Sequence, residues 1–119
     1  MPHIAIISSS IRTGRNSHRV ALFFKEFLTS RQLATVDLID LDVYDFPLFN
    51  ERIWNLPNPS AALLDYQSRI GSAEGIIIVT PEYNGGYPAS LKNAIDVLYK
   101  EWRRKPIAIS TASDGIFGG

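Results

Sequence analysis

Three loops carry the side chains best suited to chemistry in this sequence, and the first reads SSSIRTGRNSHR from Ser8 to Arg19. It combines hydroxyl groups, a glycine, arginines and the expected start of a helix. Exposed backbone N–H groups, a helix dipole and guanidinium groups all attract anions, so the loop predicts a phosphate site. The same residues also fit a plain strand end followed by a helix cap, and the loop alone leaves both interpretations open.

The segment TPEYNGGYPASLKNAID, from Thr80 to Asp96, is more specific. Its paired glycines and flanking prolines let the backbone approach a flat ligand closely, with N–H and C=O groups facing it. Tyr83 adds a ring that can stack on such a ligand or meet its edge. The alternative is a tight turn with a helix cap. A third, glycine-rich loop, SDGIFGG, runs from Ser113 to Gly119.

Composition limits the class of protein that these loops serve. The 119 residues include 12 Lys and Arg and 12 Asp and Glu, whereas a groove for nucleic acid normally shows a basic excess. There is no cysteine, which excludes disulfides and thiolate sites and leaves redox chemistry to a bound cofactor. The N-terminal apolar run is too short for a signal peptide or a membrane span. We therefore expect a cytoplasmic protein with no nucleic-acid or membrane partner.

Strand and helix patterns alternate along the chain and predict one α/β domain over residues 1–119. Short β-branched runs predict strands at His3–Ile7, Thr35–Ile39, Gly75–Thr80 and Ile107–Thr111. Apolar spacings of three and four predict helices from about Ser17 to Ser30, from Ser60 through Ile70 and from Pro88 through Leu98. This alternation favours a doubly wound parallel sheet with helices on both faces. Its ligand site is expected beyond the carboxyl ends of the strands, where the three loops meet.

The segment from Asp40 to Ser60 breaks the alternation, because it contains several prolines and yet is rich in large apolar groups. Loops normally avoid such groups, so we expect this aromatic loop to lie against a ligand or a second subunit. Its large apolar residues are Tyr44, Phe46, Leu48, Phe49, Ile53 and Trp54.

Four stretches of the sequence resemble the NADPH-dependent FMN reductases, a family that includes quinone, chromate and azo-compound reductases. They are SSSIRTGRNS, FPLFNE, TPEYNGGYPASLKNAID and STASDGIFGG, and with them the resemblance covers essentially the whole chain. It implies a flavodoxin-like, three-layer α/β/α fold that binds flavin mononucleotide (FMN). It also implies an enzyme that passes hydride from NADPH or NADH through FMN to a small acceptor such as a quinone, a flavin or an azo compound. Members of the family usually work as homodimers or homotetramers.

The resemblance also assigns residues to the cofactor. Ser10, Arg12 and Ser17 would hold the FMN phosphate, and His18 is either a further phosphate contact or a helix-capping residue. The loop after the third strand would line the isoalloxazine ring, largely through backbone groups, and the last loop would lie along its pyrimidine side. The residues of these two loops are Pro81, Glu82, Tyr83, Asn84, Gly85, Ser113, Gly115 and Gly118. No side-chain acid, base or nucleophile is required, so no catalytic residue and no metal ligand is assigned.

Some positions depart from the family pattern. Ser9 stands where glycine is usual. As a separate point, Arg15 is expected to be a solvated loop arginine; the alternative is that it attracts the extra phosphate of NADPH. The family sheet has five strands in the order 2-1-3-4-5, whereas this chain supplies four, in the order 2-1-3-4. The fifth strand and the C-terminal third of the family are therefore expected to be absent, which would leave the strand at Ile107–Thr111 as an uncovered edge.

Three other functions compete with the reductase. A truncated, flavin-free interaction module would keep the fold without the cofactor. A flavodoxin-like electron carrier would bind FMN without accepting hydride, but such carriers tend to be strongly acidic and this chain is balanced. A dinucleotide dehydrogenase is disfavoured because GxGxxG is missing and no room is left for a substrate domain.

Overall fold

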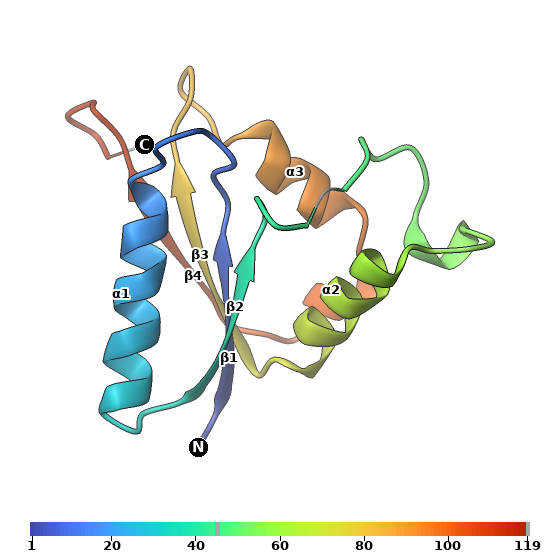
Figure 1. The fold of residues 1–119 in the computed structure, drawn as a ribbon, viewed down its shortest axis with the longest axis horizontal. Coiled ribbons are helices and arrows are strands. Elements are labelled where there is room, and N and C mark those ends of the chain that lie inside the picture. Colours follow the sequence, from blue (N-terminus) through green and yellow to red (C-terminus); the bar gives the residue numbers. More distant parts are fainter. Residues whose placement is uncertain (45, 119) are drawn as a thin grey trace.

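The four apolar runs form one parallel sheet in the computed structural model, which describes residues 1–44 and 46–118 (Figure 1). The strand order is β2-β1-β3-β4, as predicted, and each neighbouring pair is parallel. Each strand begins at the predicted residue and ends one residue later than predicted. The strands are β1 (His3–Ser8), β2 (Thr35–Asp40), β3 (Gly75–Pro81) and β4 (Ile107–Ala112). Gly119, the last residue of the predicted third loop, lies outside the described residues.

Helices cover both faces of this sheet. Figure 1 shows α1 (Ser17–Ser30) on one face, and α2 (Ala61–Ser72) and α3 (Ala89–Asp96) on the other. The predicted cap of α2 is present, because Ser60 Oγ accepts a hydrogen bond from the Leu63 N–H at 3.1 Å.

Helix α3 is shorter than the predicted segment from Pro88 through Leu98. It ends at Asp96, whose carbonyl accepts a hydrogen bond from Arg52 Nη1 at 2.6 Å. The aromatic loop thus supplies a partner for the end of this helix, a contact between distant parts of the sequence that helical spacing does not reveal. Two short 3-10 helices complete the fold: η1 (Ile53–Asn55) and η2 (Lys100–Trp102).

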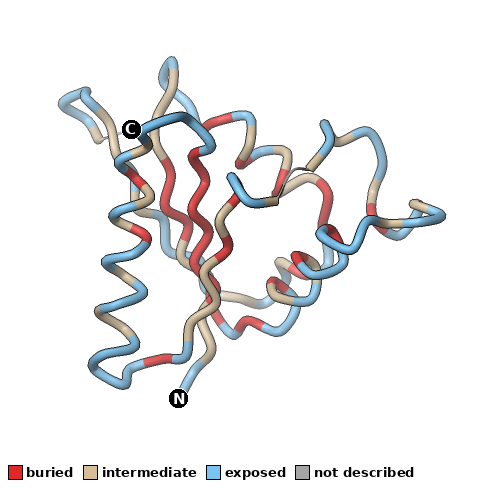
Figure 2. The backbone as a smooth tube through the Cα atoms, viewed as in Figure 1, coloured by how far each residue is buried: buried red, intermediate tan, exposed pale blue. Residues whose placement is uncertain are grey.

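The core is centred on β1 and β3, where Figure 2 shows the longest buried stretches of the sheet. Successive side chains of β1 are buried on opposite faces. Ile6 packs with Ala21 and Val79 on the α1 side, and Ile7 belongs to the cluster with Tyr66 on the α2 and α3 side. A strand covered on both faces is expected to contain a continuous apolar run, as β1 does from Ile4 to Ile7. No helix in the described part of the chain has the length and apolarity that a membrane span requires.

Ser9 carries a polar group that the fold does not satisfy. The residue is fully buried, and its Oγ has no hydrogen-bond partner among the described residues. Because an unpaired buried hydroxyl carries a desolvation cost, we expect Ser9→Ala to raise the free energy of unfolding by about 1 kcal/mol. Urea denaturation of the flavin-free protein measures this. Ser10→Ala is the matched control and should lower stability, since Ser10 Oγ accepts from the Arg12 N–H. A Ser9→Ala protein less stable than wild type would contradict the prediction.

Candidate cofactor site

The three loops meet at the carboxyl ends of β1, β3 and β4, as a parallel sheet of this order requires (Figure 1). Between them lies an open cavity of about 450 Å³. The residues predicted from the sequence that line this cavity are Ser10, Arg12, Ser17, Pro81, Glu82, Tyr83 and Ser113. The other predicted residues lie outside its lining: His18, Asn84, Gly85, Gly115 and Gly118.

One end of the cavity is built to receive an anion. The amides of Thr13, Gly14 and Asn16 make no hydrogen bond to any described residue. Helix α1 begins there with no side-chain cap and no acidic residue in its first turn, so its free N–H groups keep their partial positive charge. Gly14 has φ +70°, a backbone conformation that most other residues adopt only with strain. The local chain is thus shaped around donors that the protein itself does not use.

The other end of the cavity is held in shape by Glu82. Its carboxylate accepts hydrogen bonds from the Gly85 N–H at 2.6 Å and from Ser113 Oγ at 2.7 Å. These bonds, the Gly85 bond first, lower the pKa of Glu82 below its ordinary value. Tyr83 connects this end with the first loop, since its hydroxyl lies 3.3 Å from Ser10 Oγ. All three loops are therefore joined by side-chain hydrogen bonds.

His18 does not line the cavity, although it stands in the first turn of α1. Its Nδ1 lies 2.8 Å from Ser8 Oγ, and its Nε2 lies 3.9 Å from a carboxylate oxygen of Asp40. Both ring nitrogens thus face groups at the ends of β1 and β2. The phosphate contact suggested by the resemblance stays a prediction.

Asp40 is a residue of this region that sequence reasoning missed. It ends β2 and binds Arg15 through both carboxylate oxygens, one of them 2.7 Å from Arg15 Nη2. The hydrogen bond from Arg15 holds the pKa of Asp40 below its ordinary value, and the same contact raises the pKa of Arg15. Arg15 is therefore not the solvated loop arginine that the sequence suggests. The available signal was an acidic residue at the carboxyl end of a strand predicted to lie beside β1.

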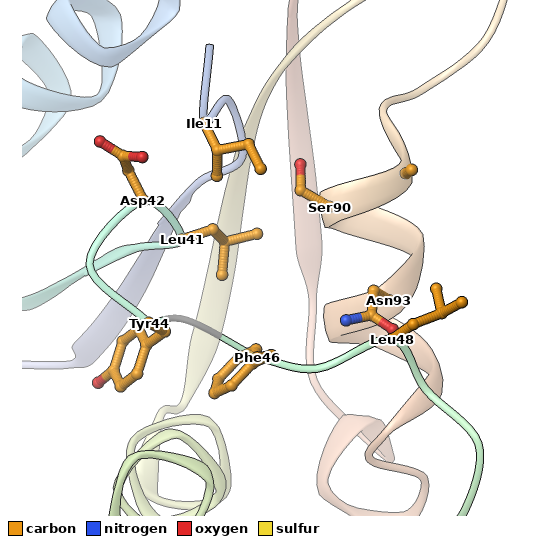
Figure 3. Close-up of a pocket in the computed structure, with 9 residues that line it drawn as sticks. Ile11, Leu41, Asp42, Tyr44, Phe46, Leu48, Ser90 and Asn93 are labelled. Atoms are coloured by element: carbon orange, nitrogen blue, oxygen red, sulfur yellow. The ribbon is translucent and has the colours of Figure 1, made fainter. Parts of the chain in front are cut away.

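The aromatic loop forms one wall of a second, smaller cavity of about 280 Å³, with Ile11 of the first loop and Asn93 of α3 also in its lining (Figure 3). Tyr44 and Phe46 stack there with ring centroids 5.2 Å apart. Burial and a hydrogen bond to Asp65 raise the pKa of Tyr44 to about 12, so its hydroxyl stays protonated at neutral pH.

Asn93 of α3 fastens the aromatic loop. Its Oδ1 accepts from the Phe49 N–H at 2.5 Å, and its Nδ2 donates to the Pro47 carbonyl at 3.0 Å. Helical spacing alone indicated only capping, solvation or packing for this residue.

The sheet order, the helices on both faces and the polar loops at the carboxyl ends together define a flavodoxin-like α/β fold. Residues 2–119 match the family model described as NADPH-dependent FMN reductase. The chain therefore belongs to the NADPH-dependent FMN reductase family, as the sequence motifs indicated.

Curated relatives point to the same family. An NAD(P)H-dependent FMN reductase of Schizosaccharomyces pombe is 36% identical over 99% of this chain and 60% of its own length. A quinone reductase of Pseudomonas putida is 31% identical over 98% of this chain and 62% of its own length. The chain thus spans about three fifths of the length of these relatives.

Solved structures share the fold. The NAD(P)H:(acceptor) oxidoreductase FerB from Paracoccus denitrificans aligns with a TM-score of 0.78 and 26% identity, over 98% of this chain and 63% of FerB. The apo form of an NADH:FMN oxidoreductase aligns with a TM-score of 0.80 over 99% of this chain and 62% of that protein; at 20% identity it supports the fold alone.

Proposed function

We propose that this chain belongs to an NAD(P)H-dependent FMN oxidoreductase that reduces a small acceptor such as a quinone, a flavin or an azo compound. The observation that carries the proposal is the cavity at the carboxyl ends of the strands, which combines an anion-binding end with a backbone-lined end. Membership of the family and the names of the relatives support it.

The donor set of the cavity suits the chemistry of FMN. The phosphate needs hydrogen-bond donors and positive charge, which Ser10, Arg12, Ser17 and the free amides of the first loop would supply. The flat ring system needs close backbone groups, which the residues from Pro81 to Tyr83 and Ser113 would supply. The family resemblance adds His18, Asn84, Gly85, Gly115 and Gly118 to the proposed site, although they lie outside the cavity lining.

FMN, when bound, supplies the hydride chemistry, so the protein needs only to bind and orient FMN and to exclude water from it. Arg12 and the amides of the first loop would fix the phosphate end. Glu82 would hold the second and third loops at a set distance through Gly85 and Ser113. We assign no proton transfer to a side chain, because hydride transfer through bound FMN requires no side-chain acid, base or nucleophile.

The same proposal includes a cytoplasmic location, where reduced nicotinamides are abundant, and a homodimer or homotetramer. The oligomer is supported by the aromatic loop, in which Leu48, Trp54 and the neighbouring Tyr99 are exposed large apolar residues. Either NADPH or NADH would serve as donor. The acceptor would occupy the same space as the nicotinamide donor, against FMN in the cavity between the three loops.

An FMN titration of the purified chain, followed by anaerobic addition of NADPH, tests the proposal. We expect saturable quenching of flavin fluorescence and then bleaching of the flavin absorbance. Binding without bleaching would favour the electron carrier, for which balanced charge gives no support. A folded protein that does not bind FMN would overturn the proposal and favour the flavin-free module.

A further inference from the structure

Arg15 is the least exposed side chain of an otherwise exposed turn. The residues from Ile11 to Asn16 are exposed, except for Arg15, whose side chain is only 16% accessible. Its guanidinium meets both carboxylate oxygens of Asp40, which is itself 16% accessible, and Nη1 also donates to the Ser10 carbonyl at 3.0 Å. A long, charged side chain rarely gives up solvent in this way unless all its contacts are made.

These contacts close the first loop upon itself and fasten it to the sheet. The bond from Arg15 to the Ser10 carbonyl joins the two ends of the turn. Because a peptide group is planar and trans, fixing that carbonyl also fixes the direction of the Ile11 N–H, which points the opposite way. Asp40 lies opposite Ser8 in the register of β1 and β2, so the carboxylate is anchored where the loop leaves the sheet.

We propose that Arg15 and Asp40 form an ion-paired latch that positions the loop from Ser10 to Ser17 for a phosphate monoester. Arg15 lines the cavity, but its guanidinium is engaged by Asp40 and the Ser10 carbonyl rather than by the phosphate. The inference rests on the proposed function for the identity of the ligand, but not for the ordering of the loop. Arg15 and Asp40 are thus positioning residues, and Arg12, which pairs with no carboxylate among the described residues, is left as the cation for the phosphate.

If Asp40 acted only through its charge, the change in FMN affinity on its removal would have the opposite sign. Asp40 places a negative charge close to the loop, so its removal would strengthen binding of an anionic ligand if only long-range electrostatics mattered. A latch predicts weaker binding, because the loop must then be ordered at the expense of binding free energy. The sign of the change in FMN affinity therefore separates the two roles.

Asp40→Asn is the principal test, measured by amide hydrogen exchange and by FMN titration. In the flavin-free protein we expect the Arg12 amide, which donates to Ser10 Oγ, to exchange roughly tenfold faster, while the amides of β1 and β3 stay protected. FMN affinity should fall by roughly tenfold, and riboflavin affinity should stay within about twofold of wild type. Arg15→Gln breaks the same pair from the exposed loop and should reproduce both changes.

Asp42→Asn is the matched control, because it removes the same charge without breaking the latch. Asp42 is 52% accessible and lies 3.8 Å from Arg15 Nη2. The amide exchange and the FMN affinity of the Asp42→Asn protein should stay within about twofold of wild type.

Unchanged exchange in Asp40→Asn and Arg15→Gln, or tighter FMN binding by Asp40→Asn, would overturn the latch. If the amides of β1 also exchange faster in Asp40→Asn, the sheet itself is disturbed, and the exchange and FMN affinity of Arg15→Gln then decide whether the latch exists. If wild type binds no FMN, the proposed function fails, while the exchange measurement still judges the latch.

Discussion

Replacing both Arg12 and Ser17 by Ala should weaken FMN binding by about 100-fold and leave riboflavin binding nearly unchanged. Arg12 is exposed at the cavity and Ser17 is buried at its lining, so both can face a phosphate without rearrangement. A charge-assisted hydrogen bond contributes about 1.5–3 kcal/mol and a neutral one about 1 kcal/mol, and 1.4 kcal/mol corresponds to a tenfold change in affinity. Parallel fluorescence titrations with FMN and riboflavin measure the difference.

Arg31→Ala is the control for net charge, because Arg31 lies at the opposite end of α1, over the Phe27 ring. It should change neither affinity by more than about twofold. Equal losses of FMN and riboflavin affinity in the double variant would show that the first loop is not the phosphate site.

Tyr66→Ala should lower the free energy of unfolding by about 4 kcal/mol, a large share of the 5–15 kcal/mol typical of a domain. Tyr66 is fully buried, with its ring 5.1 Å from that of Phe46 and its hydroxyl donating to the Ala94 carbonyl at 2.8 Å. The side chain thus joins α2 to α3 and supports the aromatic loop. Urea denaturation followed by circular dichroism measures the loss.

Two further variants separate the contribution of the hydrogen bond from that of burial. Tyr66→Phe keeps the packing and removes only the bond to Ala94, so a loss of about 1–1.5 kcal/mol is expected. Tyr99→Ala removes the same kind of side chain from a site where it is 54% exposed, and should cost less than about 1 kcal/mol. If Tyr66→Ala lowers the free energy of unfolding by less than about 1.5 kcal/mol, the prediction that this side chain is part of the core is wrong.

The strands and the first helix could be predicted because their signals are local. The apolar run of β1 and the three-and-four spacing of α1 each report burial within one element, and both elements start where predicted. Alternation of strands and helices then leaves few topologies, and the order β2-β1-β3-β4 was among them. The end of α3 was misplaced because the apolar spacing continues to Leu98, which is buried in the core although the helix ends at Asp96.

The candidate site divides in the same way. The sequence by itself placed polar and glycine-rich loops at the carboxyl ends of the strands, which in a parallel sheet converge on one cavity. Only the tertiary structure decided how those loops are held: Arg15 by Asp40, Glu82 by Ser113, and the aromatic loop by Asn93. The physical reason is that composition and spacing report which residues avoid water. Which donor meets which acceptor depends on distances between segments far apart in the chain, and these are set when the sheet assembles.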